Sequence, residues 1–161
     1  MYRIIKLLIF LCLINNTALA ADTAADVVKQ GIKLWLGNNI PAAEEKFKYA
    51  IKNFPEEREA YARLAGLYLT DNRFDQAIAA YQNVINMDPE NARLFAGISM
   101  AYLHLARYQM AQSMASEALR LDPELKQAKN IKKYIEAKLK KLDKENASLP
   151  KPKLPGITPA H

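Results

Sequence analysis

Apolar residues recur at three- and four-residue steps along most of this chain, which is the spacing of one face of an α-helix. The clearest stretch is Arg58–Asn91, where two such faces are separated by Asp71 and Asn72. Asn accepts the left-handed backbone conformation that a tight turn between helices needs. The pattern therefore predicts a helix hairpin that buries Tyr61, Leu64, Leu67, Tyr68, Phe74, Ala77, Ile78, Tyr81, Val84 and Ile85.

A similar unit lies on either side of this hairpin. Pro55, Pro89 and Pro123 stand in equal register, thirty-four residues apart. A proline cannot continue a helix, but it suits the first turn of the next one. No stretch alternates strictly enough to predict a strand, so we expect an all-α fold. The predicted helices cover 24–36, 41–53, 57–70, 74–86, 91–104 and 108–120.

The three units resemble tetratricopeptide repeats, whose pattern combines bulky, small and aromatic residues and ends on proline. The resemblance implies a right-handed solenoid of helix hairpins, with repeats at about 24–57, 58–91 and 92–125. Gln30, Ser99 and Ala115 depart from the pattern, which places Leu, Gly or Ala, and an aromatic residue at those positions. The matching residues are Val27, Gly31, Leu34, Ala43, Phe47, Ala50 and Pro55; Tyr61, Leu64, Ala65, Tyr68, Ala77, Tyr81 and Pro89; and Phe95, Ile98, Tyr102, Ala111, Ala118 and Pro123.

The first twenty residues have the order of a secretory signal peptide: a basic start, the apolar run Leu7–Ile14, and Ala18-Leu19-Ala20 before a cleavage site. We expect cleavage before Ala21 and export, to the periplasm of a Gram-negative-type envelope. An uncleaved anchor is the alternative, although the apolar run is short for a membrane span. Cys12 is the only cysteine and would leave with the signal, so the mature chain would have no disulfide.

Charge is concentrated at the C-terminal end. Residues 21–125 carry eleven Lys and Arg against fourteen Asp and Glu, whereas residues 126–161 carry ten against three. No basic stripe runs through the repeats, which argues against nucleic acid as the ligand. An apolar stripe from Ala128 to Leu142 predicts a capping helix over about 124–142, with a surface for acidic partners or anionic lipid as the alternative. Residues 143–161 form a Pro/Lys-rich segment that we expect to be a flexible tail.

The sequence carries little that could perform catalysis. His104 is the only histidine before the final residue, His161. No metal-ligand spacing, glycine-rich phosphate loop or serine elbow is present in the sequence. We therefore expect a protein that is not an enzyme and that uses no cofactor and no metal.

The tetratricopeptide resemblance also implies a concave groove, lined by the first helix of each repeat, that binds a segment of a partner protein. Trp35 is the strongest single contact, because tryptophan often buries a large flat surface at interfaces. Packing against the next repeat is the alternative for Trp35 and Leu69. The positions that would line the groove are Val28, Ile32, Trp35, Glu59, Ala62, Arg63, Gly66, Leu69, Arg93, Ala96, Met100, Leu103 and His104.

Some members of this family bind a C-terminal carboxylate with a Lys/Asn/Asn/Lys/Arg set. The matching positions here are Val28, Ile32, Arg63, Arg93 and Gly97, and only Arg93 keeps the cationic character in place. An apolar helix or extended segment is therefore the expected guest. We expect a scaffold or adaptor for envelope or secretion-complex assembly, with a membrane-surface or cell-wall-associated adaptor acting through the basic C-terminal helix and tail as the alternative.

Overall fold

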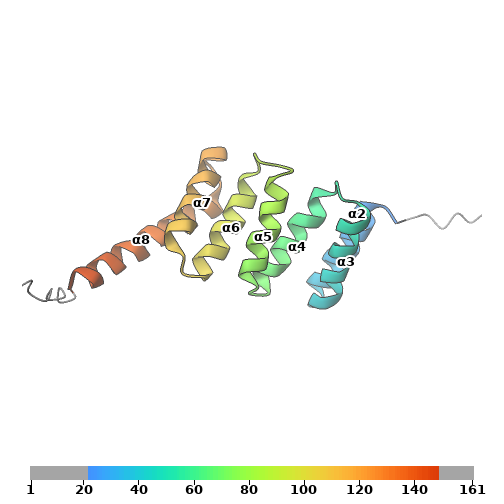
Figure 1. Ribbon diagram of the computed structural model, residues 1–161, viewed down its shortest axis with the longest axis horizontal. Helices are drawn as coiled ribbons and strands as arrows, with labels where there is room; N and C mark the ends of the chain where they lie inside the picture. The colour runs from blue at the N-terminus through green and yellow to red at the C-terminus, as the bar shows by residue number, and fades with distance from the viewer. Residues whose placement is uncertain (1–21, 149–161) are drawn as a thin grey trace, which may run out of the picture. The chain divides into compact units, whose positions relative to one another are not determined.

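The computed structural model describes residues 22–148 (Figure 1), so the expected signal peptide and residues 149–161 of the tail lie outside it. All seven elements in the described range are helices, which confirms the all-α prediction. They are α2 (Ala24–Leu36), α3 (Ile40–Asn53), α4 (Arg58–Thr70), α5 (Phe74–Ile85), α6 (Ala92–His104), α7 (Tyr108–Leu121) and α8 (Lys126–Ser148).

The last helix differs most from its expected bounds. It begins at Lys126 and continues past Leu142 to Ser148, into the segment expected to be a flexible tail. Residues 143–148 contain neither proline nor glycine, and Lys141 pairs with Glu145 at 3.6 Å along the helix. Helix-breaking chemistry begins only at Pro150, because proline disfavours helical backbone in the residue before it. None of the helices in residues 22–148 has the length and apolar character that crossing a membrane requires.

The turns inside the hairpins repeat one backbone conformation. Asn38, Asn72 and Ala106 have φ values of 59°, 60° and 56°, in the left-handed region, and they follow one another at the repeat spacing. The prediction for Asn72 is confirmed. Ala106 occupies the same conformation without the polar side chain that makes it tolerable for Asn, so the third turn is strained relative to the other two.

The described residues belong to two compact units, of which the first ends at Arg63. Here α2 begins with a capping box: the Thr23 hydroxyl accepts from the Asp26 N–H at 3.2 Å, and the Asp26 carboxylate accepts from the Thr23 N–H at 3.3 Å. The Thr23 hydroxyl also donates to the Asp26 carboxylate at 2.7 Å. This bond is the largest cause of the lowered pKa of Asp26, and the bond from the Thr23 N–H is the second. Asn39 caps α3 through a bond from the Ala42 N–H.

The core of this first unit depends on a close approach of α2 and α3. A Cβ added to Gly31 would lie 2.5 Å from Cε1 of Phe47, so only glycine fits against that ring. Phe47 is fully buried, as are Ala43 and Ala50 on the same face of α3. The small residue at Gly31 therefore creates the space that the aromatic residue fills.

The second unit begins at Leu64, within α4. It also contains a glycine that makes room for an aromatic ring on another helix. A Cβ added to Gly97 on α6 would lie 2.5 Å from Cζ of Tyr81 on α5. Burial of Tyr81 raises the pKa of its phenol. Ser99, the departure from the repeat pattern, is fully buried, and its hydroxyl donates to the Ala111 carbonyl at 2.7 Å across the α6–α7 hairpin. Its hydrogen bond makes a buried hydroxyl acceptable at a position that favours Gly or Ala.

α8 supplies the bulk that the third hairpin lacks. Ala115 stands where the other two hairpins have Phe47 and Tyr81, and the space is filled by Ile131 and Ile135 of α8. A second cluster joins Ala96, Ala118 and Ala128, all fully buried, so that α6, α7 and α8 approach closely. The apolar stripe of α8 is thus committed to covering the end of the last hairpin.

Candidate functional site

The thirteen predicted groove positions differ widely in exposure. Val28 and Ala96 are buried and can shape a surface only from beneath. Half-buried positions are Ile32, Trp35, Ala62, Gly66, Leu69, Met100 and Leu103, and exposed positions are Glu59, Arg63, Arg93 and His104. The half-buried apolar residues and the exposed charged ones are the members that a partner could contact directly.

Trp35 packs inside its own hairpin. Its ring meets Phe47 edge to face, with the ring centroids 6.3 Å apart and the planes at 84°. This geometry is a favourable one for aromatic pairs. Since Trp35 remains half-buried, part of the residue stays accessible on the first unit.

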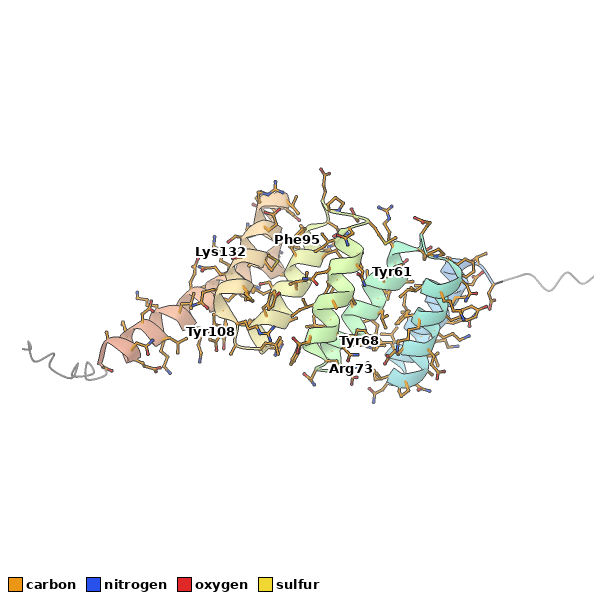
Figure 2. The ribbon with its side chains drawn as sticks, in the orientation of Figure 1. Tyr61, Tyr68, Arg73, Phe95, Tyr108 and Lys132 are labelled. Atoms are coloured by element: carbon orange, nitrogen blue, oxygen red, sulfur yellow. The ribbon has the colours of Figure 1, made fainter. Side chains whose placement is uncertain are left out.

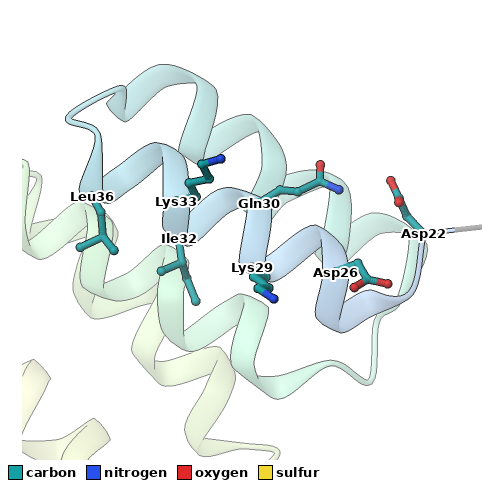
Figure 3. Close-up of a pocket in the computed structure, with 7 residues that line it drawn as sticks. All are labelled: Asp22, Asp26, Lys29, Gln30, Ile32, Lys33 and Leu36. Carbon is teal, nitrogen blue, oxygen red and sulfur yellow. The ribbon is translucent and has the colours of Figure 1, made fainter.

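A recess of about 600 Å³ lies along α2 (Figure 3). Leu36, Ile32, Lys29 and Asp26 project from the same side of the helix, and Leu36 is 83% exposed. Asp22, Gln30 and Lys33 complete the lining. A second recess, of about 480 Å³, continues from Gln30 and Lys33 toward Leu34, Gly37, Asn39 and Lys46. α2 therefore presents apolar side chains between charged ones.

Only Ile32 of the first recess was among the predicted groove residues. Leu36 was missed because the groove positions came from the tetratricopeptide resemblance rather than from exposure. The signal was in the sequence, since Leu36 lies four residues after Ile32 and so shares its helix face.

The two charged predicted residues of α4 pair with each other. The Arg63 guanidinium lies 2.8 Å from the Glu59 carboxylate, and both side chains are about half exposed. Exposed pairs of this kind stabilise a helix by only about 0.3–0.5 kcal/mol. A partner could therefore exchange this contact for its own at little cost.

In the second unit, Met100 and Leu103 pack against the cluster formed by α7 and α8. His104 stacks on Phe74, with centroids 4.7 Å apart and planes at 3°. These three predicted residues line a recess of about 320 Å³ with Tyr108 and Tyr134. Tyr134 was not predicted, because the groove was placed on the repeats and not on the helix that follows them.

Earlier in the sequence of the same unit, Arg73 lies over the ring of Tyr68, with its guanidinium carbon 4.3 Å from the ring centroid (Figure 2). Arg73 also pairs with Asp71 at 3.6 Å. These contacts hold the turn between α4 and α5 in place. Over residues 22–148, no three His, Cys, Asp or Glu side chains gather as a metal site would require.

Comparison with known proteins places the fold. A family model described as "Tetratricopeptide repeat" matches residues 28–92, and a second with the same description matches residues 68–133. None of the curated proteins compared with the chain matches its sequence.

Similar solved structures include the tetratricopeptide domain of OM64 from Arabidopsis, with 24% identity and a TM-score of 0.66 over 70% of this chain and 93% of that one. The second such domain of human RPAP3, solved with an HSP70 peptide, has 21% identity and a TM-score of 0.66 over 70% and 94%. The yeast Sti1 TPR2B domain, solved as a pHsp70 complex, has 20% identity and a TM-score of 0.67 over 71% and 97%.

At these identities the structures establish the fold and not the ligand. The two family models together extend over residues 28–133 and agree with the hairpins described above. Residues 28–133 of this chain therefore consist of tetratricopeptide repeats.

Proposed function

We propose that this protein is an exported scaffold or adaptor that binds a segment of a partner protein. The binding surfaces are those presented by the first helix of each repeat. The observation that carries the proposal is the recess along α2, where Leu36 is 83% exposed beside Ile32. Exposed apolar side chains gathered in a recess are typical of interaction sites. Tetratricopeptide domains of the same fold have been solved with HSP70 peptides, which supports a protein segment as the guest.

The guest differs in chemistry from a C-terminal carboxylate. Among the five positions of the carboxylate-binding set, Val28 is apolar and 2% exposed, and Gly97 is closed by Tyr81. Arg63 is engaged with Glu59. The half-buried side chains Ile32, Trp35 and Leu69 favour a segment with apolar residues instead.

Photocrosslinking in cells tests the binding surface directly. A benzophenone amino acid would replace Ile32, Leu36 or Leu103, and, as controls, the exposed Lys52 on α3 or Gln82 on α5. We expect one discrete protein adduct from the first set and none from the controls. Adducts that appear equally at every position, or nowhere, would contradict the proposal.

Export and periplasmic location in a Gram-negative-type envelope form the second part of the proposal, which rests on the first twenty residues of the sequence. The intact mass of the protein from a periplasmic fraction should correspond to a chain beginning at Ala21. A protein that retains Met1 and stays with the cytosol would remove both the export and the role in envelope or secretion-complex assembly.

A membrane-surface or cell-wall adaptor is the less favoured function. Its support is α8, whose sequence contains eight lysines against three acidic residues. However, Ile131 and Ile135 are buried against α7, so the apolar face that an interfacial helix would insert into lipid is already occupied. Electrostatic attraction alone would remain, and it would weaken steeply with salt.

A further inference from the structure

The recess formed by α6, α7 and α8 is lined by Met100, Leu103 and three ring-bearing side chains, His104, Tyr108 and Tyr134. Met100 and Leu103 of α6 supply its apolar lining, and both also pack against the core cluster of α7 and α8. Tyr108 begins α7, and Tyr134 of α8 is 57% exposed. A volume of about 320 Å³ suits one large apolar side chain with part of its backbone rather than a whole helix.

Two lysines continue the side of α8 that carries Tyr134. Lys138 and Lys141 follow Tyr134 at four- and seven-residue steps, which places them on the same side of α8. On α6, Arg93 lies seven residues before Met100 and is exposed, so it extends the same face away from the recess.

None of the five residues that line the recess is acidic. The sequence of α6 contains no acidic residue. Glu136 lies two positions from Tyr134, a spacing that turns it to another side of α8. Asp75 is paired with Arg107, the residue before Tyr108, at 3.5 Å. A guest with carboxylates on both sides of an apolar residue therefore meets complementary charge.

From these observations we infer that the recess between α6, α7 and α8 binds an acidic protein segment through one large apolar side chain, with Tyr134 as the principal contact and Lys138 as the charge partner. This inference rests on the proposed function, and it adds to the α2 recess a second binding site with a stated chemistry. It also gives α8 a binding role in addition to its packing role.

The test is a selection of random dodecapeptides, displayed on phage, against the purified chain. We expect the enriched peptides to contain one Leu, Phe or Trp between Asp and Glu residues. Fluorescence anisotropy with the best peptide should then show affinity reduced about tenfold or more by Tyr134→Ala, since a tyrosine that becomes buried at an interface often supplies a large share of the binding energy. Lys138→Gln should reduce affinity several-fold and make binding less sensitive to salt.

Matched control variants show whether a loss of affinity comes from the recess itself or simply from removing any exposed tyrosine or lysine. Tyr49→Ala removes a comparably exposed tyrosine, 53% exposed, from α3. Lys140→Gln removes an exposed lysine from another side of α8. Both should leave affinity unchanged. Far-UV circular dichroism of all four variants verifies that they are folded.

The outcomes divide cleanly. Enriched peptides that are neutral or basic, or that bind regardless of Tyr134→Ala, would overturn this inference while leaving a peptide-binding scaffold intact. No enrichment at all, together with no crosslinks from Ile32 or Leu103, would overturn the proposed function as well. Binding to phosphatidylglycerol vesicles that is lost in Lys138→Gln, with no peptide enriched, would identify a lipid surface and refute the acidic segment.

Discussion

Replacing Gly31 by alanine has two opposing effects on the free energy of unfolding: a steric clash with Phe47 and a gain in helix propensity. A methyl group at this position would lie 2.5 Å from Cε1 and 2.8 Å from Cδ1 of Phe47. Distances this short force a movement, and Phe47 has little room for one, because it is fully buried and meets Trp35 edge to face. The opposing effect is helix propensity, since alanine favours the interior of a helix over glycine.

The magnitudes decide the sign. Overpacking a core by one group destabilises by about 1–3 kcal/mol. The exchange of glycine for alanine in a helix stabilises by about 1 kcal/mol. We therefore expect Gly31→Ala to lower the free energy of unfolding by up to about 2 kcal/mol. In a Phe47→Leu background, which lacks Cε1 and Cζ but keeps a Cδ1, the same exchange should destabilise less than it does with Phe47, or be neutral.

Urea unfolding measures this through two signals. Circular dichroism reports all the helices, and the fluorescence of Trp35, the single tryptophan, reports the first hairpin. Gly37→Ala is the matched control, because an added Cβ there meets only carbonyl oxygens at 3.4 Å and the backbone φ is −78°. That variant should unfold at or above the wild-type urea midpoint.

The result that would refute the reasoning is a stabilised Gly31→Ala protein whose gain is the same with Phe47 or with leucine at position 47. Zero coupling in that double-mutant cycle would mean that the methyl group and the ring never meet. The close packing of α2 on α3 would then be wrong.

Three further predictions follow from single contacts. Ala106→Asn should raise the free energy of unfolding by about 1 kcal/mol, because asparagine tolerates the left-handed backbone there; Ala137→Asn, on an exposed helical site, should lower it slightly. Ser99→Ala should lower it by about 1 kcal/mol through loss of the buried bond to Ala111, whereas Ser113→Ala, which removes an exposed bond, should have little effect. Because burial raises the pKa of Tyr81, the unfolded chain ionises first as the pH rises above the ordinary value of 10.0, so stability should fall there. Tyr81→Phe should make that fall shallower, as measured by urea unfolding between pH 9 and 11, and an unchanged slope would contradict the assignment.

The repeat pattern was enough to predict the hairpins because the residues that define it act locally. Asn72 specifies its turn through its own backbone preference, and Gly31 creates space for a ring on the adjacent helix of the same hairpin. These are short-range requirements, and they recur at a fixed period. For that reason the expected helices up to 120 agree with the structure to within one residue at either end.

The sites were harder to predict because exposure depends on what packs above each residue. Ala96 and Met100 occupy equivalent faces of α6 in sequence, yet Ala96 is enclosed by Ala118 and Ala128, while Met100 borders an open recess. Tyr134 could not be assigned from the pattern either, since the apolar stripe predicts which side of α8 is buried but not that a residue beside it borders a recess.

Because Ala115 stands where the other hairpins have an aromatic ring, the last hairpin depends on α8 to fill its core. Without Ile131 and Ile135, the alanine-lined side of α7 would be exposed to water. Truncating the chain after Leu125, which removes α8, should therefore destabilise the whole C-terminal hairpin. A molecule bound at Tyr134 would stabilise the packing of α8 against α7. At one hundred times its dissociation constant it would stabilise the folded chain by about 2.7 kcal/mol, enough to reveal it in a simple melting screen.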